Sequence, residues 1–196
     1  MSDLDALLSA FALKDERRTG WQLRGVVDPE SVAAHAWGVS YLCLCFADRA
    51  GVDVDRALRL AVVHDVAEAE VGDVPTRADP SAETMPAAEK VEREREAMAD
   101  LTAALDPGEA IRDLWEEYEA RETPEARFVR DMDLVEMCLQ ALYYEREGRY
   151  DPAAGESFEA YDRLDEFFAT AEPRLRTDVG EALFAEIRDR YEAVRG

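Results

Sequence analysis

The stretch LAVVHDVAEAEVGDVP, Leu60 to Pro75, sets ionisable side chains into an apolar run. The run has no polar stripe from Leu60 to Val63, which is typical of a helix or strand buried on all sides. The ionisable side chains are His64, Asp65, Glu68 and Asp73. Burying such groups costs several kcal/mol unless a partner, often a metal ion, compensates them. The stretch therefore predicts a cation site.

Helical spacing of apolar residues recurs on both sides of this stretch, whereas no alternating strand pattern of useful length and no internal repeat occurs. The sequence therefore predicts an all-α fold. A chain of 196 residues is long enough to bury a sizeable core. We expect one domain over 1–196, with a helical core at about 28–145 and extra C-terminal helices at about 155–194, formed by the amphipathic segments 157–171 and 173–194.

The helices nearest to the stretch have clear start and stop signals. Residues 28–30, Asp-Pro-Glu, combine a capping residue, a proline for the first helical position and an acid, and they predict a helix that runs to Gly51. Asp53 or Asp55 is expected to cap the next helix, which would continue through His64 as far as Gly72.

The charge of the chain is strongly acidic. Its 45 acidic and 23 basic residues give a net charge of −22. Such a domain repels itself and any polyanion at ordinary ionic strength, where the Debye length is roughly 8 Å, but much less at molar salt, where that length is roughly 3 Å. We infer the cytoplasm of a halophile and no nucleic-acid partner. The alternative, an acidic surface for one partner, is disfavoured because the acids are spread along the whole chain.

Nothing in the sequence predicts a membrane segment. No apolar run reaches eighteen residues, and the N-terminus lacks the basic start of a signal peptide, so a cytoplasmic protein is expected. Cys43, Cys45 and Cys138 lie in apolar stretches without CxxC spacing. They predict reduced core thiols rather than the alternative, a zinc-thiolate site.

A basic segment, DERRTGWQLRGVV at 15–27, interrupts this acidic chain and is predicted to be a connecting loop. Arg17, Arg18 and Arg24 gather around Trp21, and guanidinium groups suit bidentate binding of phosphate. The alternative is a solvated loop whose Trp21 packs into the core, since buried tryptophan anchors are common.

The chain has only two histidines, His35 and His64, and the second stands in the buried His-Asp pair. Asp133 lies beside the apolar stripe of a helix predicted over 124–147. With Asp65, these residues make a set of two nitrogen and two oxygen ligands. Such a set suits Mn, Co, Fe, Ni or Zn and leaves positions open for water and substrate. A His-Asp dipeptide alone is weak support for a site, because it arises by chance.

The wider pattern resembles the HD-domain phosphohydrolases, and within them the 5'-deoxynucleotidases. The likeness spans roughly residues 10 to 145. It is carried by RTGW at 18–21, PESVAAH at 29–35, LAVVHDVAEAEVGDVP at 60–75, EKVEREREAM at 89–98, LWEEYE at 114–119 and RFVRDMDLVEM at 127–137.

The resemblance implies roles for particular residues. The positions that match the family's metal ligands are His35, His64, Asp65 and Asp133. Glu68 and Asp73 match an acidic pair that contacts the sugar, orients the attacking water or holds a second ion such as Mg. Arg18 matches a phosphate-contacting arginine and Trp21 a residue near the nucleotide. The loop at 72–86 is rich in Gly, Pro and small polar residues and is predicted to lie over the site as a lid. We add Arg77 of this loop and Lys90 beside it as substrate-binding candidates.

The activity that the resemblance implies is metal-dependent removal of the 5'-phosphate from deoxynucleoside 5'-monophosphates, with a small nucleotide as the partner. The resemblance also implies a homodimer, whose interface would suit the amphipathic C-terminal helices. Two alternatives stay open: a non-catalytic nucleotide-binding or scaffolding protein of the same fold, and a phosphodiesterase acting on other nucleotides.

Overall fold

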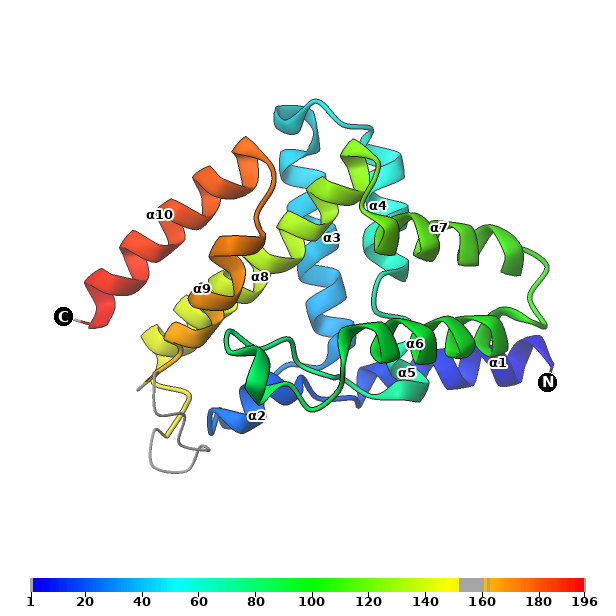
Figure 1. Cartoon of the computed structure of the whole chain (residues 1–196), viewed down its shortest axis with the longest axis horizontal. Helices are drawn as coiled ribbons and strands as arrows, with labels where there is room; N and C mark the ends of the chain where they lie inside the picture. Colours follow the sequence, from blue (N-terminus) through cyan, green and yellow to red (C-terminus); the bar gives the residue numbers. More distant parts are fainter. Residues whose placement is uncertain (1, 152–160, 162, 196) are drawn as a thin grey trace.

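The computed structural model describes residues 2–151, 161 and 163–195, and it confirms the all-α prediction (Figure 1). These residues form no strand, and two isolated bridges pair Arg17 with Ser31 and Val26 with Tyr150. The α-helices are α1 (Asp3–Ala10), α2 (Thr19–Leu23), α3 (Val32–Ala50), α4 (Val54–Val63), α5 (Glu68–Val71), α6 (Ala87–Thr102), α7 (Gly108–Ala120), α8 (Pro124–Glu147), α9 (Asp165–Ala171) and α10 (Asp178–Arg195). Short 3₁₀ turns lie at Phe11–Lys14, Pro80–Ala82 and Glu172–Arg174.

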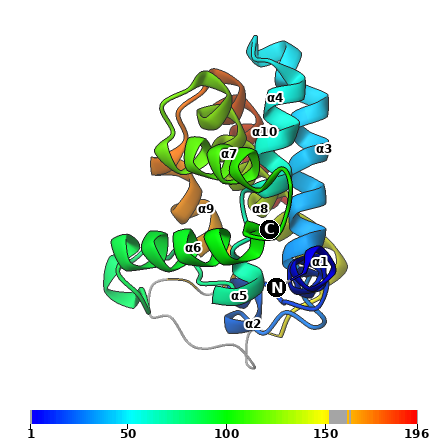
Figure 2. The same ribbon diagram turned by 90° about the vertical axis from the view of Figure 1, so that its right-hand side faces the viewer.

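Helix α8 runs through the centre of the molecule and contacts α3, α4, α7, α9 and α10 (Figures 1 and 2). Its predicted bounds agree with the structure because Thr123 caps its first turn and Gly148 ends it in the left-handed region. Phe128, Met132 and Cys138 of this helix are fully buried in the main core. Three acidic residues of this central helix, Asp131, Asp133 and Glu136, are buried as well.

Helix α3 does not begin where the sequence predicted. Residues 30–32 pair instead with 16–18: the N–H of Val32 donates to Glu16 O, and that of Arg18 donates to Glu30 O. Asp28 has a φ of +50° and cannot cap a helix, so Ser31 accepts the N–H of Ala34 instead. The segment 15–27, predicted as a loop, contains the short helix α2.

The helix that carries the His-Asp pair ends earlier than predicted. Helix α4, capped by Asp53, ends at Val63, and His64 is its C-cap. The following turn is closed by tight bonds, since the N–H of Glu68 donates to Asp65 O and that of Val66 to Val63 O. The His-Asp pair therefore lies in the turn between α4 and α5 rather than within one straight helix.

The C-terminal helices pack onto α8. Asp131 of α8 accepts the N–H groups of Arg176 and Thr177, which fixes the turn before α10. A Cβ on Gly180 would lie 2.5 Å from Asp131 Oδ2, so the close approach requires glycine. The helix predicted over 157–171 is present from Asp165; residues 157–160 and 162 lie outside the described part.

Two smaller expectations can be compared with the structure. Cys43 and Cys138 are buried, as predicted for core thiols, whereas Cys45 is exposed. Among the described residues, no helix combines the length and the apolar character needed to cross a membrane.

Candidate active site

Four residues predicted as metal ligands converge from three helices and one turn. His35 of α3 and His64 at the end of α4 bring their Nε2 atoms within 3.4 Å. Asp65 Oδ2 lies 3.1 Å from the Nε2 of His64 and 3.6 Å from that of His35. Asp133 Oδ1, from α8, lies 3.2 Å from His35 Nε2. The ligand atoms of His35, His64 and Asp65 all lie within 4.8 Å of one another, so these three side chains could hold one ion, and Asp133 borders the set through His35.

The hydrogen bonds on the far side of each imidazole fix its tautomer. His64 Nδ1 lies 2.7 Å from the carbonyl oxygen of Ala61, and His35 Nδ1 lies 2.6 Å from Glu136 Oε2. Both partners are acceptors, so each Nδ1 carries a proton and donates it. The two Nε2 atoms then face each other beside two carboxylates, an arrangement typical of a metal site with its outer hydrogen-bond layer.

The charges around the site favour a cation as well. Burial and Arg18 work against a charged His35, but Glu136 and Asp133 outweigh them and raise its pKa well above the usual value. Burial alone would raise the pKa of Asp133, yet Arg130 and His35 hold it well below its usual range. Two buried imidazoles and two carboxylates held in this way suit a borderline divalent metal.

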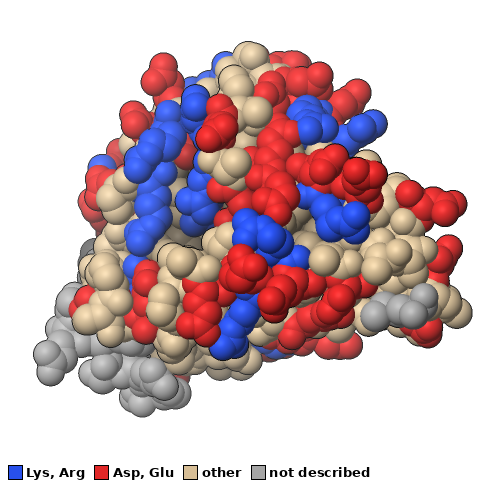
Figure 3. Space-filling model, turned by 45° about the vertical axis from the view of Figure 1, so that its right-hand side comes forward, with Lys and Arg blue, Asp and Glu red and all other residues tan. Residues whose placement is uncertain are grey.

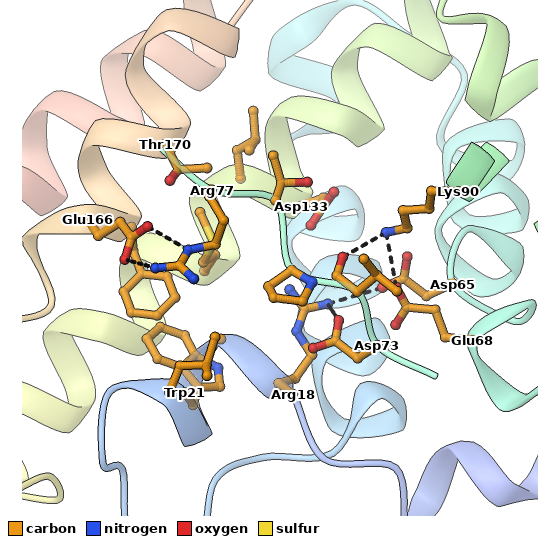
Figure 4. A pocket seen from close by; sticks show the side chains of 18 of the residues that line it. Arg18, Trp21, Asp65, Glu68, Asp73, Arg77, Lys90, Asp133, Glu166 and Thr170 are labelled. Atoms are coloured by element: carbon orange, nitrogen blue, oxygen red, sulfur yellow. Dashed lines mark hydrogen bonds and ion pairs between the residues drawn. The ribbon is translucent and has the colours of Figure 1, made fainter. Parts of the chain in front are cut away.

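A pocket of about 760 Å³, open mouth included, lies in front of this cluster (Figure 4). His35 and His64 are buried behind its wall. The other predicted site residues line it: Arg18, Trp21, Asp65, Glu68, Asp73, Arg77, Lys90 and Asp133. The folded chain thus brings all ten predicted residues to one site.

Arg18 lies at the metal end of the pocket. Its Nη1 is 3.2 Å from Asp65 Oδ2 and 4.0 Å from Asp73 Oδ1. Burial opposes its charge, but Asp73 and Asp65 raise its pKa well above the ordinary value, so the guanidinium stays cationic. Asp73 is itself held in place by Thr19, whose N–H donates to its carboxylate and whose hydroxyl donates to its carbonyl at 2.9 Å.

Glu68 and Lys90 form the neighbouring wall. Lys90 Nζ lies 3.5 Å from Glu68 Oε1 and donates to the carbonyl of Val74 at 3.1 Å. Glu68 Oε2 is buried and has no hydrogen-bond partner among the described residues. Burial, and then the charges of Asp65 and Asp73, raise the pKa of Glu68 well above its usual value. A carboxyl group with these properties is suited to exchange protons with a water molecule in the pocket.

Trp21 and Arg77 lie at the opposite end of the pocket (Figure 4). The ring of Trp21 packs on Phe167, with 3.9 Å between ring centroids, and its Nε1 donates to Glu30 Oε1 at 3.0 Å. Arg77 pairs with Glu166 through two hydrogen bonds of 2.7 and 3.1 Å. Trp21 is therefore buried in the core, as one interpretation of segment 15–27 expected, and it also lines the pocket.

Several residues of the site were not predicted. Glu136, Tyr118 and Arg130 hold the metal-site side chains from behind, and Glu166 with Thr170 completes the far wall. A signal existed for Glu136, because an acid three residues after Asp133 on a buried helix shares a face with it. None existed for Glu166, whose partners are remote in the sequence.

Comparison with known proteins agrees with this geometry. A model of the HD domain matches residues 10–175. A relative from Danio rerio named 5'-deoxynucleotidase HDDC2 is 40% identical over 166 residues, which cover 83% of this chain and 74% of the relative.

Solved structures share the fold over nearly the whole chain. The PH0347 protein from Pyrococcus horikoshii OT3 is 30% identical with a TM-score of 0.71, over 96% of this chain and 98% of that one. A structure titled as a predicted metal-dependent phosphohydrolase from Magnetospirillum magnetotacticum is 26% identical with a TM-score of 0.66, over 97% and 90% of the two chains. The matched segment contains the whole metal cluster and most of the pocket wall, and the chain belongs to the HD-domain family, in the branch that includes the 5'-deoxynucleotidases.

Proposed function

We propose that this protein is a metal-dependent 5'-deoxynucleotidase, which hydrolyses deoxynucleoside 5'-monophosphates to deoxynucleosides and phosphate. The observation that carries the proposal is the convergence of both histidines of the chain with Asp65 and Asp133 beside a pocket that Arg18 lines. The names of the relatives at about 40% identity support the substrate class.

The residues proposed to hold the metal are His35, His64, Asp65 and Asp133. A divalent ion bound there supplies a Lewis acid that activates water and neutralises charge on the phosphoryl oxygens. A second ion, if one binds, would have Glu68 and Asp73 as its carboxylate ligands. The nitrogen ligands favour Mn, Co, Fe, Ni or Zn over Mg at the first site.

Arg18 is proposed to bind the phosphate. It is the cation that borders both Asp65 and Asp73, so a phosphate group at the metal end of the pocket lies within its reach. Its guanidinium would then stabilise charge on the phosphoryl oxygens. This local positive charge is needed because the whole chain carries −22.

Glu68 is proposed as the proton acceptor for the attacking water and as the later donor to the leaving 5'-oxygen. Its buried Oε2 has no hydrogen-bond partner in the described chain, and its raised pKa suits a group that takes up and returns a proton. Lys90 is assigned to orienting Glu68 rather than to the substrate. Asp73, fixed by Thr19, is proposed to contact the sugar or the water.

The far end of the pocket is proposed to take the sugar and base. Trp21 and Phe167 offer ring surfaces there. Since Arg77 is engaged with Glu166, we assign it to shaping this wall rather than to binding phosphate.

The test is phosphate release by the purified protein in molar salt with Mn, Co or Mg. The panel contains deoxynucleoside and ribonucleoside monophosphates, cyclic nucleotides and nucleoside tetraphosphates. We expect release from the deoxynucleoside monophosphates, loss of that release after chelation, and no metal bound by His64→Ala when metal content is measured. Turnover of cyclic substrates alone would make it a phosphodiesterase, and metal binding without any turnover would make it a non-catalytic binding protein.

A further inference from the structure

Arg130 of α8 lies one turn before Asp133 and lines the same pocket, with 20% of its side chain exposed. Its Nη1 donates to Asp133 Oδ2 at 2.5 Å and to the hydroxyl oxygen of Tyr118 at 3.3 Å. In the part of the chain that the structure describes, its Nη2 makes no hydrogen bond and its buried Nε has no partner. Buried donors without a partner are rare in folded proteins, so these open nitrogens beside a pocket indicate an acceptor that a ligand supplies.

Arg18 has the matching arrangement on the other aspartate of the metal cluster. Its Nη1 donates to Asp65 Oδ2 at 3.2 Å, as the Nη1 of Arg130 donates to Asp133. Figure 4 shows Arg18 and Asp133 entering the pocket from opposite directions. The two aspartates both approach His35 Nε2, at 3.6 and 3.2 Å. A group bound at the cluster therefore has one guanidinium beside each aspartate.

The position of Arg130 along α8 fits the phosphate end of a bound nucleotide. The ring surface proposed for the base includes Phe167, whose carbonyl oxygen lies 3.9 Å from the Sγ of Cys138. From Cys138 back to Arg130 the helix spans about 12 Å, at 1.5 Å per residue, and Asp133 lies between them. A nucleotide that reaches from Phe167 to the metal cluster therefore has its phosphate on the side of Arg130.

The carboxylates at the metal end of the pocket favour a second cation for the phosphate. The acidic residues that line this end are Asp65, Glu68, Asp73 and Asp133. Lys90 is already engaged, since its Nζ lies 3.5 Å from Glu68 Oε1 and 3.4 Å from Glu94 Oε1. Acidic side chains repel a phosphate dianion, and an arginine with free donors offsets that repulsion at close range.

We propose that Arg130 is a second phosphate-binding arginine, an assignment that rests on the proposed function. Its Nη1 stays on Asp133 while Nη2 contacts a phosphoryl oxygen, which a guanidinium with several fixed donors can do. Tyr118 allows this sharing, because its buried hydroxyl donates to the same Oδ2 of Asp133 at 2.9 Å. The ring of Tyr118 also packs edge-on against His64, with 5.3 Å between centroids. Asp133 therefore stays held when Arg130 pairs with the substrate.

The experiment measures nucleotide binding by calorimetry on the metal-loaded protein in molar KCl. A Glu68→Gln background keeps the substrate intact, and deoxyadenosine 5'-monophosphate is compared with deoxyadenosine, which lacks the phosphate. Adding Arg130→Gln should weaken binding of the monophosphate by about 10- to 100-fold, the worth of one charge-assisted hydrogen bond. Binding of deoxyadenosine should not change.

Two matched variants separate contact with the phosphate from a role in holding Asp133. Tyr118→Phe removes the other donor to Asp133 Oδ2 and, at saturating metal confirmed by metal analysis, should bind the monophosphate like the background protein. Arg127→Gln removes the same charge from the same helix, where the guanidinium donates to the carbonyls of Arg121 and Glu122. It should also bind like the background.

Arg130→Lys covers the case in which the glutamine variant fails to fold, which thermal unfolding checks. It keeps a cation beside Asp133 but has a single nitrogen, so binding of the monophosphate should still fall by about tenfold. Full affinity in either Arg130 variant, or an equal loss in Tyr118→Phe, would overturn the proposal and leave Arg130 as a support for Asp133. A wild-type protein that binds no nucleoside monophosphate would overturn the proposed function as well.

Discussion

At the scale of single residues, the absence of a side chain at Gly38 allows Glu136 to reach His35. A Cβ at position 38 would lie 2.7 Å from Glu136 Oε1, closer than atoms tolerate. Gly38→Ala should therefore displace the carboxylate and free the Nδ1 of His35. Loss of such an outer partner typically weakens metal binding about 10- to 100-fold.

This prediction is checked by calorimetric titration of the metal-free protein with Mn or Zn. Ser40→Ala is the control on the same helix, because the Ser40 hydroxyl donates only to the carbonyl of Ala36 among the contacts described. Equal affinity of Gly38→Ala and wild type would show that Glu136 does not support the metal ligand.

Glu30 makes stability depend on pH. Burial, and then the charge of Glu136, raise its pKa from 4.5 to about 7. An acid with a raised pKa binds its proton more tightly in the folded state than in the unfolded one, so its contribution to stability falls as pH rises from about 4.5 to 7. Glu30→Gln should match wild type near pH 4.5 and be more stable above pH 7, by about 2 kcal/mol because Glu30 is only partly buried.

Urea unfolding of both proteins between pH 4.5 and 8 measures this difference. The amide oxygen of glutamine can still accept the Trp21 N–H, so the hydrogen bond seen for Glu30 is preserved. A difference between the two proteins that does not vary with pH would contradict the assignment.

The residues that the sequence could identify were those with unusual chemistry for their surroundings. His64 and Asp65 stood out because they interrupt a buried apolar run, and His35 because it is the other histidine of the chain. Glu166 could not be found in this way. An acid in an acidic chain gives no local signal, and its partners Arg24 and Arg77 are 142 and 89 residues away.

At the scale of elements, Glu166 fastens α9 to the wall of the pocket. It accepts from Arg24 Nη2 at 2.7 Å and from Arg77 through two bonds, and all three residues are buried. Removing one member of a buried ion cluster is strongly destabilising, since charges are left without their shared partner. Glu166→Ala should lower the free energy of unfolding by about 3 kcal/mol.

Thermal unfolding and hydrogen exchange of α9 measure that loss. The control is Glu172→Ala, which breaks an exposed pair with Arg188 and should cost about 0–1 kcal/mol. If the two variants unfolded alike, Glu166 would have no special role in docking α9.

Element boundaries were predictable where local capping decided them. The bounds of α8 follow from Thr123, Pro124 and Gly148, which act within their own helix. The predicted start of α3 was wrong because residues 30–32 make backbone hydrogen bonds with residues 16–18, and a local capping signal carries no information about that pairing. These hydrogen bonds between remote segments, and not the capping signal at 28–30, decide where α3 begins.

At the scale of the whole molecule, the acidic surface sets the conditions in which the fold is stable. Acidic side chains cover much of the face in Figure 3, with arginines between them, and the chain carries −22. We propose that the protein works in a halophile's cytoplasm, where salt screens this self-repulsion. The melting temperature should rise steeply with KCl up to about 0.5 M and then level off, because the Debye length falls from roughly 10 Å at 0.1 M to 3 Å at 1 M.

A comparison of KCl with KBr distinguishes screening of charge from a general strengthening of apolar burial by salt. Screening depends on ionic strength, so KCl and KBr at equal concentration should raise the melting temperature equally below about 0.5 M, whereas effects on apolar burial differ between anions and keep growing with concentration. Differential scanning calorimetry in both salts makes the comparison. A melting temperature that is already maximal in 0.1 M KCl would remove the halophilic interpretation and leave the acids as a surface for a partner.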